Sequence, residues 1–414
     1  MYLTEKEDYM KGAARHSFIY KTAKALLMPI LKRKFNYSFE YVVPVSSPYI
    51  VLCNHVTNSD PLLAGLAFKD SMYFVASDHL FRLGLISKLL VFAVSPIARA
   101  KTTTDTQTVL QIFRRLKEGY NICIFAEGFS TFSGVTGPIP ASIGRLVRRT
   151  GVSLITYRLR GGYLTYPRWS PTVRKGRMTG EEVCQYTAAE LKNKTDEEVE
   201  RLIERDLHVD AYADQEASLV AYSGKTLAEH LENALYCCPH CHSFSTMTSK
   251  DDLFACTCGY SVRYTPYGYF EVPSASLIPL VYKTVLEWFD WQKGMLHRMI
   301  MENSSVPAKG PLFTDQDQQL FQTVRATNNI LLGSGTLSLF ADRLVFALEP
   351  GSPRVFLLSD ITDLSIITRM TIIFSTTDRQ SYEIHSEWPR NAVKYLEAFI
   401  LLKNEGTSVM ECAL

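Results

Sequence analysis

The chain has 414 residues, of which 46% are hydrophobic and 21% are charged. This composition excludes a disordered chain and a bundle of membrane helices, and the length exceeds what one hydrophobic core usually supports, so we expect two or three domains. The 44 Lys and Arg residues against 42 Asp and Glu residues leave a net charge of +2, so we expect no nucleic-acid partner.

The N-terminal segment predicts a helix over residues 14–34. Its apolar side chains recur at helical spacing and it ends in three basic residues, which suits a helix lying on an anionic membrane and equally suits a helix packed on its own domain. The start of the chain lacks the apolar core of a secretory signal. The most apolar stretches, residues 18–31 and 83–98, contain lysines and are shorter than the about 20 apolar residues of a spanning helix. We therefore expect a cytoplasmic protein that binds the inner face of a membrane peripherally.

From residue 49 onward, short apolar runs alternate with helical stretches such as residues 106–118. This alternation predicts an α/β domain, with a mixed sheet flanked by helices. Residues 180–232 are rich in charge and predict solvent-facing helices that close the domain, one of them starting at a capping box of Thr195 and Glu198. The predicted strands are residues 49–53, 72–77, 122–127 and 153–159.

The second half of the chain predicts three smaller parts. Residues 233–272 hold a cluster of cysteines, and residues 273–305 predict a connecting helix that is interrupted near Pro279. Residues 306–414 contain short alternating runs and then an amphipathic helix, an element order that resembles a pleckstrin-homology or GRAM-like module. The expected domains are therefore residues 1–232, 233–272, 273–305 and 306–414.

A histidine and an aspartate flank a polar turn, NHVTNSD, directly after the strand predicted over residues 49–53. A loop position makes His55 accessible, and an imidazole can take the proton of a hydroxyl that attacks a thioester. Asp60 can fix the imidazole tautomer and stabilise the imidazolium. Most loop histidines are structural, so the pair alone is weak evidence for a catalytic site. FAEGFS, residues 125–130, strengthens that evidence, because it is a second polar loop that also follows a predicted strand.

Three blocks in this order resemble the glycerolipid acyltransferase family typified by 1-acyl-sn-glycerol-3-phosphate acyltransferase, over residues 15–180. NHVTNSD followed by Pro61 is similar to the first block, SPIARAK to the second and FAEGFS to the third. The resemblance implies that His55 is the general base and Asp60 its partner, with no acyl-enzyme and no metal or redox cofactor in the reaction. It also implies a set of acceptor-binding residues, in which Arg99 holds the phosphate: Asn54, Arg99, Glu127 and Gly128.

The implied reaction moves a fatty acyl group from acyl-CoA or acyl-carrier protein to a hydroxyl of a lysophospholipid, foremost 1-acylglycerol-3-phosphate, at a membrane surface. The third block departs from the family pattern, which has a proline where this chain has Ala126 and an arginine where it has Ser130. The fourth block, residues 152–159, lacks the family's proline. These departures leave the acceptor's head group open, and the altered third block keeps open the alternative of a catalytically weakened relative that binds lipid or a partner.

Several nearby arginines offer a replacement for the missing positive charge, since guanidinium groups suit phosphate oxygens. Arg168 is the best candidate, because GGYLTYPRW combines glycine, aromatic and proline residues in a way that indicates a shaped loop. The alternative for each arginine is an ordinary solvated basic face. The candidates are Arg145, Arg148, Arg149, Arg158, Arg160 and Arg168.

Four of the nine cysteines form two tight turns, CPHC and CTCG. Two pairs of sulfurs joined by a hairpin favour tetrahedral thiolate coordination, so we expect a zinc ribbon with a structural zinc. The second turn has one residue between its cysteines where two are usual, which leaves Cys237, His240 and His242 as further candidate ligands; reduced buried thiols are the alternative. The predicted ligands are Cys238, Cys241, Cys256 and Cys258.

Overall fold

The computed structural model separates the chain into two compact units, the first formed by residues up to 224 and the second mainly by residues 225–414. Residues 169–171 belong with the second unit. The structure describes residues 2–77, 96–99, 106–128, 130–274, 276–304, 310–323 and 329–411, without the side chains of residues 2–15, 98–99, 303–304 and 404–411. The apolar stretch over residues 83–98 thus lies almost entirely outside the described residues.

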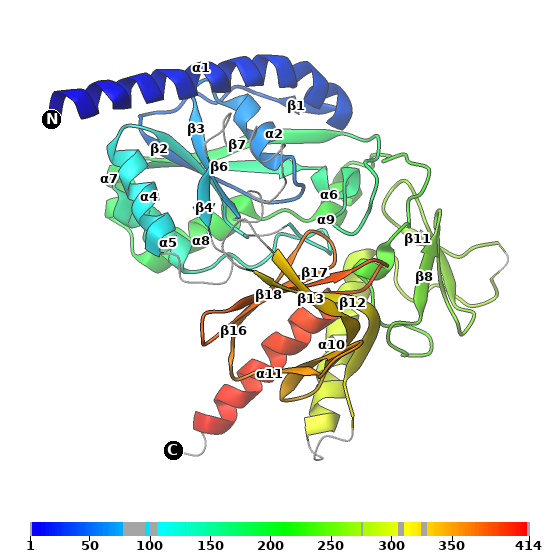
Figure 1. The fold of residues 1–414 in the computed structure, drawn as a ribbon. Helices are drawn as coiled ribbons and strands as arrows, with labels where there is room; N and C mark the ends of the chain where they lie inside the picture. Colours follow the sequence, from blue (N-terminus) through cyan, green and yellow to red (C-terminus); the bar gives the residue numbers. More distant parts are fainter. Residues whose placement is uncertain are drawn as a thin grey trace. The chain divides into compact units, whose positions relative to one another are not determined.

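A seven-stranded mixed sheet forms the centre of the first unit (Figure 1). Its strands are β1 (Tyr37–Phe39), β2 (Tyr49–Cys53), β3 (Met72–Ser77), β4 (Ile97–Arg99), β5 (Asn121–Phe125), β6 (Ser153–Arg160) and β7 (Met178–Tyr186). They lie in the order β1-β7-β6-β2-β5-β3-β4. β2 to β6 pair in parallel, whereas β7 is antiparallel to β6 and parallel to β1. This is the mixed sheet that strand and helix alternation predicts.

Helices cover both faces of this sheet (Figure 1). They are α1 (Tyr2–Phe35), α2 (Asp60–Ala67), α4 (Thr106–Lys117), α5 (Ser142–Thr150), α6 (Gly162–Thr165), α7 (Ala188–Lys192), α8 (Asp196–Leu207) and α9 (Ala211–Ala217). All of β2 is buried, and its residues alternate between two cores. Val51 and Cys53 face the core of α1 and α2, whereas Ile50 and Leu52 face the core of α4, α5 and α8.

The long helix α1 packs along the first unit with one face only. Tyr20, Leu31 and Phe35 are buried, and the Tyr20 hydroxyl donates a hydrogen bond to the Gly65 carbonyl at 3.2 Å. The opposite face keeps three large apolar side chains exposed, Phe18 at 71%, Leu26 at 68% and Ile30 at 59%. No helix among the described residues is both long enough and apolar enough to cross a membrane.

The strand β7 corrects the expectation that residues 180–232 form only helices. Its sequence MTGEEVCQY is polar, and it nevertheless forms a strand because it pairs antiparallel with β6 along most of its length and parallel with β1 at its start. The helix α8 does begin at the predicted capping box. The Thr195 hydroxyl accepts from the Glu198 N–H at 3.2 Å, and the Glu198 carboxylate accepts from the Thr195 N–H at 2.7 Å.

The second unit contains two antiparallel sheets. The smaller one has the order β11-β10-β9-β8, and the larger one the order β15-β14-β13-β12-β18-β17-β16. The strands are β8 (Met247–Lys250), β9 (Leu253–Cys256), β10 (Ser261–Tyr264), β11 (Phe270–Glu271), β12 (Phe313–Thr323), β13 (Asn329–Leu339), β14 (Arg343–Leu348), β15 (Arg354–Leu357), β16 (Ile361–Ile367), β17 (Thr371–Thr376) and β18 (Ser381–Ser386). The helix α11 (Val393–Glu411) follows β18. The C-terminal region is thus β-rich, and its likeness to a pleckstrin-homology or GRAM-like module stays a prediction.

The helix α10 (Val285–Ser304) is shorter than the helix predicted over residues 273–305. It starts at a capping box in which the Thr284 hydroxyl accepts from the Glu287 N–H at 3.0 Å, and the Glu287 carboxylate accepts from the Thr284 N–H at 3.2 Å. Trp288 then packs against aromatic rings of the small sheet, among them Tyr260 and Phe270. These rings therefore form part of a core in the second unit.

Candidate active site

Two polar loops meet at one edge of the first sheet. Cys53, the last residue of β2, pairs with Phe125, the last residue of β5. Because the two strands are parallel, the loops that follow them leave the sheet side by side. The Ala126 N–H donates to the Cys53 carbonyl at 3.1 Å, which ties the loops together where they begin. NHVTNSD and FAEG therefore share one site.

His55 and Asp60 form a hydrogen-bonded pair at this edge. The His55 Nδ1 atom lies 2.8 Å from Asp60 Oδ2. Asp60 is fully buried, whereas the His55 side chain keeps 19% of its surface exposed. The imidazole also packs at a tilt on the Phe125 ring, with 4.9 Å between ring centroids. With the Nδ1 proton donated to Asp60, the second ring nitrogen, Nε2, carries the lone pair that can accept a proton.

The Asp60 carboxylate is held by three further hydrogen bonds. Its Oδ2 atom accepts from the backbone N–H groups of Val56 at 2.6 Å and Thr57 at 2.8 Å, and its Oδ1 atom accepts from the Thr57 hydroxyl at 2.7 Å. Asp60 is also the first residue of α2, where the positive end of the helix favours a negative charge. The aspartate is therefore held in place, as a partner for an imidazolium must be.

The Glu127 side chain links its own loop to the loop of His55. Its Oε1 atom accepts from the His55 N–H at 2.6 Å, and its Oε2 atom accepts from the Gly137 N–H at 2.6 Å. Burial raises the pKa of Glu127 to about 8, although both N–H groups act to lower it. The carboxylate thus sets the backbone position of His55. Gly128 follows in the left-handed region, with φ at 76°, and turns the chain away from β5.

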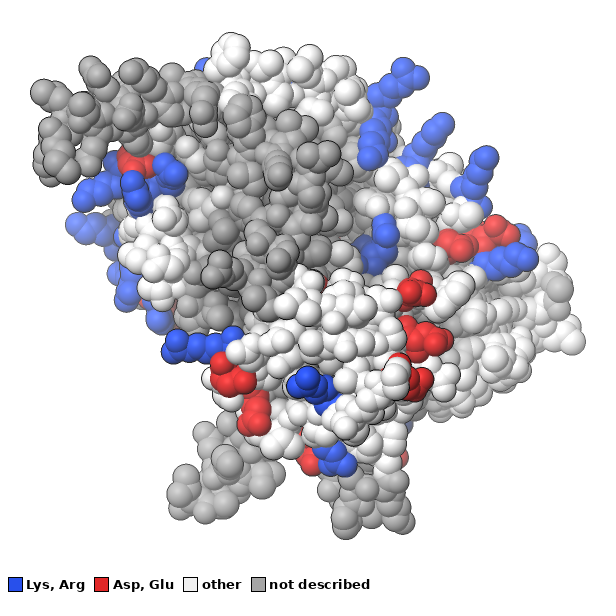
Figure 2. Space-filling model, in the orientation of Figure 1, with Lys and Arg blue, Asp and Glu red and all other residues white. Residues whose placement is uncertain are grey.

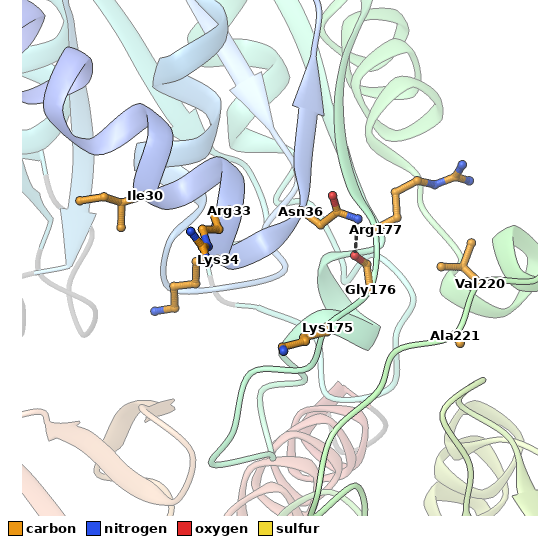
Figure 3. A pocket seen from close by; sticks show the side chains of 9 residues that line it. All are labelled: Ile30, Arg33, Lys34, Asn36, Lys175, Gly176, Arg177, Val220 and Ala221. Carbon is orange, nitrogen blue, oxygen red and sulfur yellow. Dashed lines mark hydrogen bonds between the residues drawn. The ribbon is translucent and has the colours of Figure 1, made fainter.

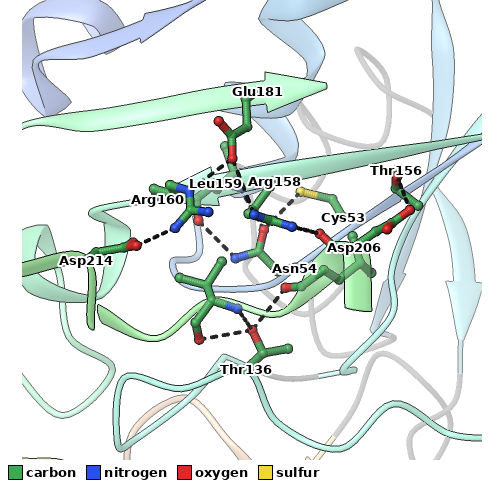
Figure 4. A network of polar contacts seen from close by, with 12 residues as sticks. Cys53, Asn54, Thr136, Thr156, Arg158, Leu159, Arg160, Glu181, Asp206 and Asp214 are labelled. Carbon is green, nitrogen blue, oxygen red and sulfur yellow. Dashed lines mark hydrogen bonds and ion pairs between the residues drawn. The ribbon is translucent and has the colours of Figure 1, made fainter. Parts of the chain in front are cut away.

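The Asn54 side chain hydrogen-bonds to the backbone of β6 and does not face an open site. Its side chain is fully buried, its amide donates to the Leu159 carbonyl at 3.0 Å, and its carbonyl accepts from the Leu159 N–H at 2.8 Å (Figure 4). These two hydrogen bonds to β6 fix the position of Asn54, the residue immediately before His55. Binding of an acceptor by the Asn54 side chain would require these two hydrogen bonds to break.

Four of the six candidate arginines are engaged in ion pairs with acidic side chains of the same unit. The pairs are Arg145 and Arg148 with Asp196, Arg158 and Arg160 with Glu181, and Arg160 with Asp214. Arg158 also donates twice to the Asp206 carbonyl, at 2.6 and 2.8 Å (Figure 4). Arg149 is exposed at the end of α5. The four paired arginines therefore have acidic partners within the first unit.

Arg168 lies against the third block. Its Nη1 donates to the Ser130 carbonyl at 2.9 Å, and its guanidinium stacks over the Phe132 ring at 4.3 Å. Burial lowers the pKa of Arg168 to about 9. Ser130 occupies the position at which the resembling family has an arginine, so a guanidinium is present at this place from another part of the chain. Arg99 ends β4, and its side chain lies outside the described residues.

The four predicted zinc ligands come together in the second unit. Their sulfurs lie within 4.8 Å of one another, with 3.8 Å between Cys238 and Cys258 and 3.7 Å between Cys241 and Cys256. A tetrahedral zinc with bonds of about 2.3 Å requires neighbouring sulfurs about 3.8 Å apart, so the group fits this metal. Within the described part of the chain, Cys237, His240 and His242 do not join it.

Two contributors to the site escaped the sequence-based reasoning. Thr57 anchors Asp60 through its hydroxyl, and its place inside NHVTNSD was a signal for it. Gly137 anchors Glu127 through its backbone N–H, which any residue type possesses. A single sequence holds no signal for such a contact.

Comparison with known proteins gives one family match. Residues 34–160, which span β1 to β6 and both loops, match the acyltransferase family. No curated protein matches the chain in sequence. Among solved structures the chain is similar to the 1-acyl-sn-glycerophosphate (LPA) acyltransferase PlsC from Thermotoga maritima, with 16% identity, 45% of this chain and 80% of that chain covered, and a TM-score of 0.37.

Two further structural likenesses are smaller. One is to a chain of the 8S snRNP assembly intermediate, with 15% identity, 24% and 85% coverage and a TM-score of 0.20. The other is to the C-terminal domain of an unknown protein from Leishmania infantum, with 13% identity, 23% and 84% coverage and a TM-score of 0.14. Structural likenesses at these values carry no functional argument, so the family match stands by itself.

Proposed function

Because residues 34–160 are a domain of the acyltransferase family, we propose that the protein transfers a fatty acyl group from a thioester donor to a hydroxyl of a lysophospholipid. The observation that carries the proposal is the 2.8 Å contact between His55 Nδ1 and Asp60 Oδ2 at the end of β2. The contact orients a partly exposed imidazole on a fixed carboxylate, as general-base catalysis needs.

In the proposed reaction, Nε2 of His55 takes the proton of the acceptor hydroxyl while its oxygen attacks the thioester carbonyl carbon. A C–O bond forms, the C–S bond breaks, and the imidazolium gives the proton to the departing thiolate. The Asp60 carboxylate stabilises the imidazolium between these two transfers. Both substrates are bound together, so no acyl-enzyme forms.

We assign recognition of the acceptor phosphate to Arg99 and Arg168. The contact of Arg168 with the Ser130 carbonyl supports this assignment, because the guanidinium then lies where the family's third block carries its own arginine. Glu127 acts by positioning His55, Gly128 by turning the loop, and Asn54 by fixing the loop to β6. The acceptor that fits this charge best is 1-acylglycerol-3-phosphate.

We further propose that the enzyme works as a peripheral protein on the cytoplasmic face of a membrane, with acyl-CoA or acyl-carrier protein as donor. The exposed apolar face of α1 supports this position, since Phe18, Leu26 and Ile30 stay in solvent otherwise. The four-cysteine group would hold a structural zinc through Cys238, Cys241, Cys256 and Cys258. Zinc bound there would supply folding free energy to the second unit, in keeping with a structural role outside the acyl-transfer site.

The proposal is tested with full-length protein, mixed vesicles, a panel of lysophospholipids and both thioester donors, with the acylated product followed by mass spectrometry. His55→Ala should lower kcat by about 10²- to 10⁴-fold, because the hydroxyl then loses its general base. His208→Ala is the matched control, since His208 is an exposed histidine of the same unit. Thermal melting should show both variants folded.

Full acyl transfer by His55→Ala would refute the assignment of the base. Absence of transfer by the wild-type protein with every donor and acceptor would favour the second reading, a weakened relative that binds lipid. Ala126 and Ser130, which depart from the family's third block, are the observations that favour that reading.

A further inference from the structure

A cavity of about 840 Å³ opens in the first unit beside the C-terminal end of α1 (Figure 3). Its walls are the last turns of α1, the residues before β7, and Val220 with Ala221. Basic side chains dominate its polar lining, and none of the described lining residues is acidic. They are Arg33, Lys34, Lys175 and Arg177. We call this the basic pocket.

Among the described residues, no carboxylate pairs with the cations of the basic pocket. Arg33, Lys34 and Lys175 are exposed, and none forms an ion pair with a carboxylate in the described part of the chain. Other arginines of the same unit, such as Arg145 and Arg160, are paired. Figure 3 shows Arg33, Lys34 and Lys175 beside the opening, while the guanidinium of Arg177 extends away. Three positive charges that no described carboxylate neutralises therefore border one cavity, which attracts an anion.

Backbone contacts hold the two walls of the basic pocket together. Asn36 ends α1 in the left-handed region, with φ at 45°, and its amide donates to the Gly176 carbonyl at 2.8 Å. Lys175 and Ser223 exchange backbone hydrogen bonds of 2.8 Å in both directions. The cations thus project from a fixed frame, so a ligand need not order a loop on binding.

The basic pocket lies at the sheet edge that carries His55. β1 and β7 begin where β6 and β2 end, because β7 runs antiparallel to β6. A Cβ atom on Gly162 would lie 2.4 Å from Val56, and one on Gly161 would lie 2.1 Å from the Arg177 carbonyl. The two glycines therefore let the loop of His55 pack closely against a wall of the pocket.

The pocket also adjoins the apolar face of α1. Ile30 belongs to both, since it is exposed on the helix and lines the cavity. Figure 2 shows basic side chains gathered over the C-terminal end of α1, at the upper right. Apolar side chains beside cations match a lipid surface, where acyl chains meet anionic phosphates. A soluble anion would make no favourable contact with the apolar side chains of α1.

We propose that the basic pocket binds the phosphate headgroup of an anionic membrane phospholipid that is not a substrate, and thereby holds the His55 edge of the sheet at the lipid surface. The binding of a headgroup is inferred from the basic pocket alone. The catalytic benefit of holding His55 at the lipid surface rests on the proposed acyl transfer. Each lysine near an anionic surface contributes about fivefold in affinity.

The test measures binding of the full-length protein to vesicles of phosphatidylglycerol with phosphatidylcholine, and to vesicles of phosphatidylcholine alone. Lys34→Gln with Lys175→Gln should weaken binding to the anionic vesicles about 30-fold and leave binding to the neutral vesicles unchanged. The matched control is Lys117→Gln with Lys192→Gln, exposed lysines of α4 and α7. Both helices cover the sheet face opposite α1, so the control should keep its affinity within about twofold.

Equal loss in the pocket pair and the control would overturn the proposal, because the attraction would then be diffuse. Release of the wild-type protein from vesicles by millimolar inorganic phosphate, but not by chloride of equal ionic strength, would also overturn it in favour of a free phosphate site. A third readout is acyl transfer with acceptor in detergent, which should be unchanged in the pocket pair; loss of it would assign the pocket to the acceptor instead. A wild-type protein without any transfer activity would count against the proposed function and leave the vesicle result as it stands.

Discussion

Asp60 orients the His55 ring. The Asp60 carboxylate is itself held by four hydrogen bonds, one of which is the bond from His55. The carboxylate accepts from His55, from the Val56 N–H and twice from Thr57, so it has four hydrogen bonds although it is fully buried. Glu127 then fixes the backbone of His55 from the neighbouring loop. At this scale one imidazole is presented in one tautomer, which is the feature that a base for a neutral hydroxyl requires.

Arg168 carries the residue-scale prediction. Arg168→Gln should raise KM for a phosphate-bearing lysophospholipid by about 10- to 100-fold, because a charge-assisted hydrogen bond is worth about 1.5–3 kcal/mol. KM for a monoacylglycerol, which has no phosphate, should change little, and Arg168→Lys should recover part of the loss. Steady-state kinetics with the two acceptors measure this difference.

Arg149→Gln is the control for Arg168, since Arg149 is an exposed arginine of the same unit. A melting temperature near that of the wild type must accompany each variant, because Arg168 packs on Phe132 and Ser130. Equal increases in KM for both acceptors would assign Arg168 to the structure of the site rather than to the phosphate.

At the scale of elements, local capping and edge position decide where helices and strands lie. α8 and α10 both start at a threonine with a glutamate three residues later, and the first of these was evident in the sequence. β7 is a strand although it is polar, because it pairs antiparallel with the buried strand β6 along most of its length. α1 divides its surface between a buried face and an exposed apolar face.

The cap of α10 gives a prediction at this scale. Thr284→Ala should lower the free energy of unfolding of the second unit by about 1 kcal/mol, because the Glu287 N–H loses its acceptor. Thr284→Ser keeps the hydroxyl and should stay within about 0.5 kcal/mol of the wild type. Urea unfolding followed by tryptophan fluorescence reports on this helix, which contains Trp288 and Trp291. Equal stability of the alanine and serine variants would contradict the role of the cap.

At the scale of the whole molecule, the chain forms two compact units, and the cysteine group, α10 and the C-terminal sheet all belong to the second. The first unit ends at residue 224, and the domain boundary expected at residue 232 stays a prediction. Each unit has its own chemistry, since the first contains the His55 site and the second contains the four sulfurs. Loss of metal should therefore act on stability in one unit and leave the chemistry of the other intact.

Metal removal is the prediction for the whole molecule. Purified protein should contain one equivalent of zinc, and its removal by a chelator should lower the melting temperature of the second unit by more than about 10 °C. Cys256→Ser with Cys258→Ser should abolish zinc binding, whereas Cys184→Ser, in the first unit, should keep the full equivalent. Metal analysis and calorimetry measure both. Less than about a tenth of an equivalent in natively folded protein would exclude the metal.

The sequence by itself determined the strands that precede the two polar loops, the pair of His55 and Asp60, and the four cysteines, because each lies in a short local pattern of residues. Periodicity also predicted the helix at residues 14–34 and the β-rich C-terminal region. The sequence failed where a polar segment such as β7 is stabilised by a distant partner, and where α10 starts only at the cap of Thr284 although the helical periodicity begins earlier.

Only the tertiary structure decided how residues far apart in the chain are used. It brought Arg168 to Ser130, assigned Asn54 to the Leu159 backbone, and paired Arg145 and Arg160 with acidic side chains. It also joined the basic end of α1 to Lys175, 141 positions after Lys34, to form one pocket. The physical reason is that hydrogen bonds and ion pairs depend on distance in space, which sheet order and register set, whereas a sequence pattern records only neighbours along the chain.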